Sequence, residues 1–204
     1  MEKRRCEWCL GSEQMVAYHD TEWGVPLFDD RKLFEFMTLD AFQAGLSWAI
    51  TLRKREGFRK AFADFRPERI ARFNRRSVER LLGDPGIIRN RQKIVATLAN
   101  AKAFLIVQDE FGSFADYIWQ FVDGRPRQNK WRTMKQIPAK TRQSEAMSAA
   151  LRERGFKFVG STICYAFMQA AGMVNDHVVG CHRYREIQRM AKRKIITRHT
   201  FQSP

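Results

Sequence analysis

Two cysteine and histidine pairs lie at opposite ends of this 204-residue chain. Cys6 and His19 stand near the start with the spacing C-x12-H, and His177 and Cys181 stand near the end with the spacing H-x3-C. Two sulfur and two imidazole ligands form a set that tetrahedral zinc prefers, and residues four apart share one side of a helix. If one ion binds all four, the N-terminal loop is tied to the C-terminal segment and the chain folds as one closed unit.

Neighbouring residues leave the ligand set open. Cys9 forms a C-x2-C pair with Cys6, and His182 directly follows Cys181, so either neighbour could substitute as a ligand. A redox role for Cys6 and Cys9 is disfavoured because no βαβ pattern surrounds them. With only four cysteines and four histidines in the chain, the spacings can also arise by chance.

The chain carries a large positive charge, with 37 lysine and arginine residues against 22 aspartate and glutamate residues and a formal net charge of +15. Such an excess attracts polyanions and supplies the phosphate-neutralising contribution that dominates nucleic-acid affinity. A soluble basic surface or a membrane-surface binder would carry the same charge. Five tryptophans and 16 phenylalanines, which can stack or wedge against bases, favour nucleic acid as the partner.

Hydrophobic residues make up 44% of the chain, which is enough for one substantial core or two small lobes that share one. No window is long and apolar enough to cross a membrane, and no apolar segment follows the charged start as in a signal peptide. We therefore expect a cytoplasmic protein with reduced thiols. A monomer is expected because no surplus apolar stripe calls for a partner.

Helical periodicity dominates the chain. Between Ile87 and Val107 apolar residues recur at helical spacing while basic and amide side chains fill the other faces, which predicts a core helix. Pro67 suits a first helical turn, and Ser77 and Ser144 are predicted N-caps. The fold class is predicted to be all-α, because no sustained strand alternation is present. Further helices are predicted at 30–39, 46–63, 77–82, 114–122, 144–154 and 161–171.

Residues 1–182 are predicted to form a single α-helical domain whose two lobes share one core. The glycine- and proline-containing segment 83–86 is predicted to separate two helices. The polar, basic stretch 123–136 is predicted to be a loop between lobes, because its flanking helices are too short to form independent cores. Residues 183–204 carry seven lysine and arginine residues against one glutamate. They are predicted to form a basic C-terminal tail, either a fraying helix or a mobile segment.

Residues 150–172 predict a helix, a tight turn bounded by glycines, and a second amphipathic helix capped by Ser161 or Thr162. Gly155 and Gly160 allow backbone N–H groups to approach an anion, and the N-terminus of the second helix adds its dipole. Lys157 in the turn is expected to face a DNA phosphate. An ordinary αα-hairpin with a glycine turn would have the same pattern, so the motif alone leaves both interpretations open.

Several short motifs are spread over residues 5–182. They are Arg5-Cys6-Glu7-Trp8, Ala17-Tyr18-His19-Asp20, Glu22-Trp23-Gly24-Val25-Pro26, Gln43-Ala44-Gly45-Leu46-Ser47-Trp48, Gly86-Ile87-Ile88-Arg89, Gly155-Phe156-Lys157-Phe158-Val159-Gly160 and Val174-Asn175-Asp176-His177-Val178-Val179-Gly180-Cys181. Across this range the chain closely resembles the DNA-3-methyladenine glycosylase I family, which belongs to the helix-hairpin-helix DNA glycosylases. Together the motifs are very specific.

The resemblance implies a helix-hairpin-helix DNA glycosylase fold in which zinc binds Cys6, His19, His177 and Cys181 and clasps the two ends together. Four protein ligands leave no open position for a water nucleophile, so the zinc is expected to be structural. The family also lacks the aspartate that most helix-hairpin-helix DNA glycosylases have two residues before the position of His177. Asn175 agrees with that, because a neutral amide cannot act as a general base.

The resemblance also implies an enzyme that flips 3-methyladenine out of alkylated double-stranded DNA and hydrolyses its N-glycosidic bond, leaving an abasic site. The alkylated base is cationic and departs easily, so binding does much of the work, and Trp8, Tyr18 and Trp48 match the pocket aromatics. No motif provides a lysine nucleophile, so strand cleavage is not expected. Without the resemblance, each ring would be assigned to core packing.

Two positions depart from the family's pattern. Asp40, the predicted catalytic carboxylate, stands where the family usually has a glutamate that hydrogen-bonds the edge of the base, and its side chain is one methylene shorter. Met15 stands where a tyrosine is frequent, and Phe42 is expected to restore aromatic surface to the pocket. The departures leave two alternatives open: a glycosylase for another modified base, and a catalytically weak DNA-binding module.

Overall fold

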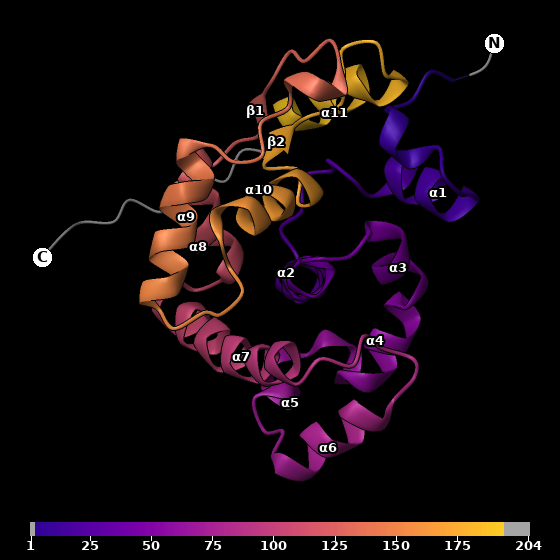
Figure 1. Cartoon of the computed structure of the whole chain (residues 1–204). Coiled ribbons are helices and arrows are strands. Elements are labelled where there is room, and N and C mark those ends of the chain that lie inside the picture. The colour runs from indigo at the N-terminus through magenta and orange to yellow at the C-terminus, as the bar shows by residue number, and fades with distance from the viewer. Residues whose placement is uncertain (1–2, 194–204) are drawn as a thin grey trace, which may run out of the picture.

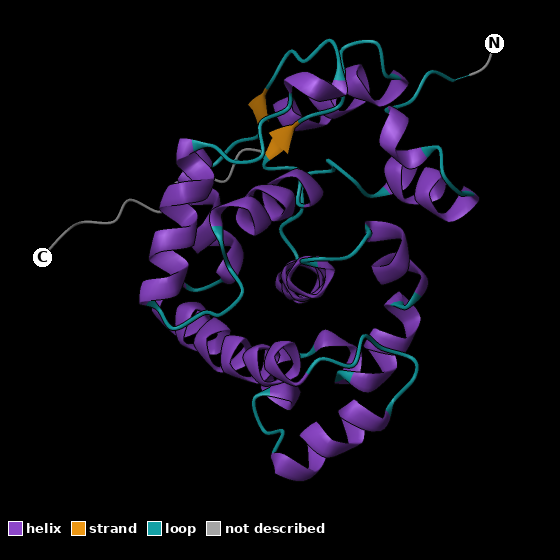
Figure 2. Cartoon of the chain, viewed as in Figure 1, coloured by secondary structure: helices purple, strands orange, loops and turns teal. Residues whose placement is uncertain are grey.

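The structure is a computed structural model that describes residues 3–193, and most of it is helical (Figure 1, Figure 2). Strands β1 (Arg127–Gln128) and β2 (Val174–Asn175) pair in parallel, with Arg127 opposite Val174. Within the described residues, no helix is both long and apolar enough to cross a membrane. The α-helices are α1 (Glu13–Thr21), α2 (Asp30–Gln43), α3 (Trp48–Arg53), α4 (Arg55–Ala61), α5 (Pro67–Ile70), α6 (Arg75–Gly83), α7 (Arg91–Phe111), α8 (Phe114–Trp119), α9 (Arg142–Glu153), α10 (Ser161–Ala170) and α11 (His182–Arg193), and the 3-10 helices are η1 (Glu7–Cys9), η2 (Ala63–Phe65), η3 (Gln120–Val122) and η4 (Met134–Gln136).

Helix α2 runs through the middle of the molecule, and the other helices surround it (Figure 1). Every residue from Leu33 to Phe42 is buried, whereas a helix on the surface would keep a polar face in water. α2 packs against α3, α7, α8 and α10, so helices from both halves of the chain cover its sides. Both halves therefore build one core around this helix.

Several predicted helix boundaries differ from the observed ones. The helix predicted over 46–63 is divided at Lys54, which ends α3 and precedes α4. Ser77 and Ser144 are not N-caps but occupy the third helical position. Asn74 and Thr141 are the N-caps, and each forms a reciprocal capping box with its serine. The N-cap side chain accepts a hydrogen bond from the N–H of the third helical residue and so fixes where the helix begins. In both helices this start lies two residues before the one predicted from the apolar pattern.

The first part of the predicted basic tail is a folded helix. α11 begins at His182, and its Tyr184 and Ile187 are buried, the latter completely. The Tyr184 hydroxyl donates to the carbonyl oxygen of Asn129 at 2.9 Å. The apolar side of this helix therefore belongs to the core, while residues 194–204 lie outside the described part of the chain.

Lys93, in the first turn of α7, fixes the C-terminal end of α2. Its ammonium group donates to the carbonyl oxygens of Phe42 at 2.8 Å and Ala44 at 2.6 Å. These carbonyls belong to the end of a helix, where no intrahelical N–H is available to them. Lys93 is only 8% exposed, and this burial lowers the pKa of its ammonium group. One side chain thus anchors the segment that leads from α2 to Trp48.

Replacing Lys93 with methionine should destabilise the protein by about 1–3 kcal/mol, because two carbonyl groups at the end of α2 lose their donor. Denaturant unfolding of the variant would measure the loss. Lys102→Met is the matched control, since Lys102 is exposed on the same helix. Equal stability of the two variants would contradict the anchoring role of Lys93.

Candidate functional site

The four predicted metal ligands lie together, although they come from opposite ends of the chain. All four side chains are buried, and their ligand atoms lie within 4.8 Å of one another. Cys181 Sγ is 3.5 Å from His19 Nε2 and 3.6 Å from His177 Nδ1, and Cys6 Sγ is 3.8 Å from His177 Nδ1. A tetrahedral ion with bonds of about 2.0–2.3 Å would separate its ligand atoms by about 3.3–3.8 Å. The residues present therefore fit a single metal ion.

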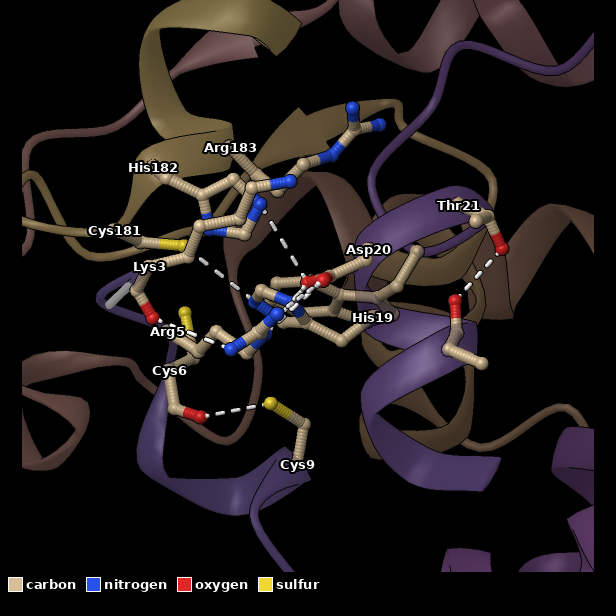
Figure 3. Close-up of polar contacts among 12 residues, drawn as sticks. Lys3, Arg5, Cys6, Cys9, His19, Asp20, Thr21, Cys181, His182 and Arg183 are labelled. Carbon is tan, nitrogen blue, oxygen red and sulfur yellow. Dashed lines mark hydrogen bonds and ion pairs between the residues drawn. The ribbon is translucent and has the colours of Figure 1, made fainter. Parts of the chain in front are cut away.

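The outer nitrogen of each imidazole has its own partner. His19 Nδ1 lies 2.8 Å from Asp20 Oδ1, and Asp20 in turn accepts from the guanidinium of Arg5 (Figure 3). His177 Nε2 lies 3.2 Å from the carbonyl oxygen of Trp23. Such partners fix the ring orientation and leave the inner nitrogens, His19 Nε2 and His177 Nδ1, turned toward the sulfur atoms.

The surroundings favour ionisation of one of the two thiols in the cluster, whereas the pKa of Cys6 is raised by its hydrogen bond with Cys181 and by burial. The pKa of Cys181 is lowered, first by a hydrogen bond from Cys6 and then by the two histidines, which favours the thiolate that metals bind. The alternative ligands are engaged elsewhere. Cys9 Sγ donates to the carbonyl oxygen of Cys6 at 3.1 Å, and His182 Nδ1 lies 3.1 Å from the carbonyl oxygen of Arg4. Neither belongs to the four-residue group.

A cavity of about 220 Å³ opens beside this cluster. The predicted aromatics Trp8, Tyr18 and Trp48 line it together, with ring centroids 6.2 Å apart for Trp8 and Tyr18 and 5.2 Å apart for Tyr18 and Trp48. Its size is below the range of about 300–1,000 Å³ for drug-sized ligands, which suits one flat heterocycle. The full lining consists of Trp8, Tyr18, Trp23, Asp40, Gln43, Trp48, Met134, Ile137, Ala166, Gln169 and Ala170.

Asp40 brings a carboxyl group from α2 to the wall of this cavity. The residue is only 5% exposed, and its Oδ2 atom has no hydrogen-bond partner among the described residues. Burial raises the pKa of Asp40 well above its usual value. The indole N–H groups of Trp8 and Trp48 are likewise buried without a partner in this part of the chain. Buried polar atoms are rarely left unpaired, so these groups are free to bind a ligand.

Two predicted pocket residues do not line the cavity. Phe42 is completely buried and packs against Phe58 and Phe62, with centroid separations of 4.7 and 6.0 Å. It follows Asp40 by two positions, which turns it by about 200° around the helix axis. Met15 is buried in α1 and does not line the cavity either. The expectation that Phe42 restores aromatic surface to the pocket was therefore wrong.

Other lining residues were not predicted from the sequence. Met134 reaches the cavity from the stretch 123–136, which is predicted to be a loop between lobes, and Ile137 directly follows that stretch. Ala166, Gln169 and Ala170 follow the i, i+3, i+4 spacing of one helix face, and this spacing in α10 was the available signal. The loop residues had no comparable signal, because only tertiary contacts bring the loop to the cavity.

A buried carboxylate holds that loop against α10. Asp176 is 1% exposed and accepts four hydrogen bonds. Asn129 Nδ2 and Trp131 Nε1 donate to its Oδ1 at 2.6 and 2.8 Å, and Tyr165 Oη and Gln169 Nε2 donate to its Oδ2 at 2.6 and 2.8 Å. Every acceptor position is in use, so the group is a structural hub.

Asn175, the residue expected from the family resemblance at the position of the superfamily aspartate, also has a structural role. Its amide donates to Gln128 Oε1 at 2.9 Å and to the carbonyl oxygen of Tyr184 at 3.2 Å. The residue is fully buried between β1 and α11 and does not line the cavity. Asn175 is therefore not in a position to assist departure of a ligand.

The α9–α10 hairpin matches the predicted helix, turn and helix. Gly155 and Phe158 both have positive φ, at 87° and 54°, which folds the connection tightly. Asn100 clamps the turn, because its side chain donates to the Lys157 carbonyl oxygen at 3.0 Å and accepts the Lys157 N–H at 2.7 Å. The backbone of the turn is held in place, while the Lys157 side chain remains exposed.

The cap of α10 differs from the prediction. Gly160 is the N-cap, and neither Ser161 nor Thr162 provides a side-chain cap. Glycine leaves the first backbone N–H groups of the helix uncovered by a side chain, and the Thr162 side chain is exposed beside them. Exposed N–H groups at a helix start form a favourable site for an anion.

Comparisons with known proteins agree with this arrangement. Residues 8–184 match the family model of methyladenine glycosylases. DNA-3-methyladenine glycosylase 1 of Escherichia coli strain K12 is 50% identical over 180 residues, which cover 88% of this chain and 96% of the relative.

Solved structures give the same result. A crystal structure of 3-methyladenine DNA glycosylase I (TAG) matches with a TM-score of 0.86 at 51% identity, covering 88% of this chain and 98% of the other. A variant of 3-methyladenine DNA glycosylase I in complex with 3-methyladenine matches with a TM-score of 0.85 at 31% identity, covering 87% and 96%. This chain belongs to the methyladenine glycosylase family.

Proposed function

We propose that this protein is a monofunctional DNA-3-methyladenine glycosylase that flips the damaged base from alkylated double-stranded DNA and hydrolyses its N-glycosidic bond, leaving an abasic site. Family membership supports the enzyme class, and a structural relative binds 3-methyladenine. The observation that carries the proposal is the Oδ2 atom of Asp40, which lies on the wall of an aromatic cavity and has no hydrogen-bond partner within residues 3–193. We further propose that the protein acts as a cytoplasmic monomer.

The cavity suits a flat cationic base. Trp8, Tyr18 and Trp48 offer electron-rich faces, and a cation over such a face gains about 0.5–2 kcal/mol. Extrusion of a base from the duplex costs a few kcal/mol of stacking, which these contacts offset. A base that already carries positive charge has a weakened N-glycosidic bond, so its departure needs no strong general acid.

Asp40 complements that charge. In the free protein, burial disfavours the ionised form of Asp40. Within the described residues, no positively charged side chain beside the carboxylate offsets this cost of desolvation. A cationic base entering the cavity supplies the missing opposite charge and donates to the partnerless oxygen. The carboxylate is desolvated when the protein folds, so its interaction with the base is strong at the moment of bond cleavage.

The hairpin supports contact with the DNA backbone. The hairpin turn and the start of α10 contain Gly155, Gly160, Ser161, Thr162 and Lys157. No side chain caps the first backbone N–H groups of α10, and the Lys157 side chain is exposed. Contacts of this kind bind phosphate without reading sequence. A backbone grip of this type, as in helix-hairpin-helix proteins, suits an enzyme that must find a lesion in any sequence context.

We also propose that Cys6, His19, His177 and Cys181 hold a structural zinc ion. When bound, zinc would supply a cross-link between the two ends of the chain and no open coordination position. Trp8 follows Cys6 by two residues, and Tyr18 directly precedes His19. Residues that bind the metal therefore also set the positions of two cavity aromatics.

The first test is release of free base from methylated duplex DNA, resolved by chromatography. The wild-type protein should release 3-methyladenine, and Asp40→Asn should release it about tenfold to a hundredfold more slowly, since a hydrogen bond to a charged group contributes about 1.5–3 kcal/mol. Asp109→Asn, on the exposed side of α7, is the matched control and should keep full activity.

Asp40→Glu belongs in the same experiment, because it restores the length of side chain that is usual in the family. Release of a different base by the wild-type protein would indicate another lesion specificity. Tight duplex binding without release of any base would indicate a DNA-binding module.

Asp40 should also make stability depend on pH. The unfolded side chain has a pKa near 3.8, and burial raises the pKa in the folded protein, so ionised Asp40 opposes folding. This penalty is absent below pH 3.8 and grows by about 1.4 kcal/mol per pH unit as the pH rises toward the folded pKa. Asp40→Asn should therefore raise the melting temperature at pH 7 and lose this advantage at about pH 3.5, where the unfolded carboxyl group is largely protonated. A gain independent of pH would argue against ionisation as its cause.

Metal analysis tests the zinc proposal. The purified protein should contain about one equivalent of zinc, and its removal should lower the melting temperature markedly, because binding energy at a structural site is folding energy. Cys181→Ala should lose the metal, whereas Cys9→Ala should retain it, since Cys9 lies outside the cluster. An unchanged melting temperature after verified zinc removal would exclude a structural role.

A further inference from the structure

Gln169 is a polar residue in a cavity that is otherwise mainly aromatic and apolar. Its amide has two ends that differ in hydrogen bonding, since the nitrogen only donates and the oxygen only accepts. Gln169 Nε2 donates to Asp176 Oδ2 at 2.8 Å. A carboxylate cannot bond to the oxygen end, so the partner fixes which end of the amide faces Asp176. The amide oxygen is therefore turned away from Asp176.

The carboxylate that fixes this orientation cannot easily move. Asp176 Oδ1 is held by Asn129 and Trp131, and Oδ2 is shared by Tyr165 and Gln169. Rotation of the carboxylate would break four hydrogen bonds in a site that is 1% exposed. A flip of the Gln169 amide would place two oxygen atoms against each other. Both movements are costly, so the amide is locked in one of its two orientations.

We propose that Gln169 is a specificity-determining residue whose amide oxygen, held in place by Asp176, accepts a hydrogen bond from the exocyclic amino group of the bound base. The inference rests on the proposed glycosylase function and deepens it. Asp40 from α2 and Gln169 from α10 then give the cavity two acceptors on different helices. An amino-bearing base satisfies acceptors, whereas a 6-oxo base directs its own oxygen at one of them. The pair therefore selects adenine-type bases.

Asp176→Asn tests the inference because it should reverse the orientation of the Gln169 amide while the side chain at position 176 keeps its hydrogen-bond partners. The oxygen of the substituted side chain can still accept from Asn129 and Trp131. Its NH2 group replaces Oδ2, so the Tyr165 hydroxyl can turn to accept. Gln169 must then direct its oxygen at this NH2 group and present its own NH2 group to the ligand.

The measurement is a titration of tryptophan fluorescence with free 3-methyladenine and with free 3-methylhypoxanthine, its 6-oxo counterpart. In Asp176→Asn the affinity for 3-methyladenine should fall about tenfold or more, since an acceptor becomes a donor. The affinity for 3-methylhypoxanthine should stay the same or rise. Equal losses for both ligands would overturn the proposal, because a merely structural role predicts no change in selectivity.

Two further variants keep the test decisive. Gln169→Met removes the acceptor and preserves the size of the side chain, so binding of 3-methyladenine should weaken even if Asp176→Asn fails to fold; an unchanged dissociation constant would overturn the proposal. Asp116→Asn weakens a carboxylate contact with Ser113 in α8, away from the cavity, and should leave the selectivity unchanged. If the proposed function itself is wrong, the wild-type protein will neither bind nor release 3-methyladenine.

Discussion

Burial of α2 on all sides is the constraint on which the rest of the molecule depends. A helix in this position would ordinarily be apolar throughout, yet it carries Glu35 and Asp40 into the core. Glu35 is neutralised by the guanidinium groups of Arg55 and Arg59, at 2.6 and 2.9 Å. Asp40 has no such partner within residues 3–193. The fold therefore stabilises one buried carboxylate and leaves the other available to a cationic ligand.

The cysteine and histidine cluster lies beside the cavity that this carboxylate lines. Trp8 contacts the ring of His19 at a centroid separation of 5.5 Å, and Trp23 contacts that of His177 at 4.6 Å. The cysteine and histidine cluster and the aromatic cavity thus share a wall. A structural change at the cluster would displace the aromatic rings of the cavity wall, because packed interiors transmit small displacements.

Two buried polar anchors position the remaining walls of the cavity. Lys93 fixes the end of α2 and the segment that leads to Trp48, and Asp176 holds the loop that carries Met134 against α10. Both anchors are well satisfied by hydrogen bonds, unlike Asp40. Satisfied networks give rigid walls, and between them Asp40 Oδ2, which has no partner in the described part of the chain, is available to a ligand.

The sequence by itself determined the helical class, because helical periodicity can be read along the chain. The four candidate metal ligands and the aromatic set followed only from the family resemblance, since spacing alone left Cys9 and His182 open as ligands and each ring could equally pack in the core. The sequence could not determine that Phe42 faces away from the cavity or that the loop containing Met134 forms one of its walls. It also gave no sign that Asp176 fixes the Gln169 amide. These features depend on the angle at which helices pack and on contacts between distant segments, which only the tertiary structure decides.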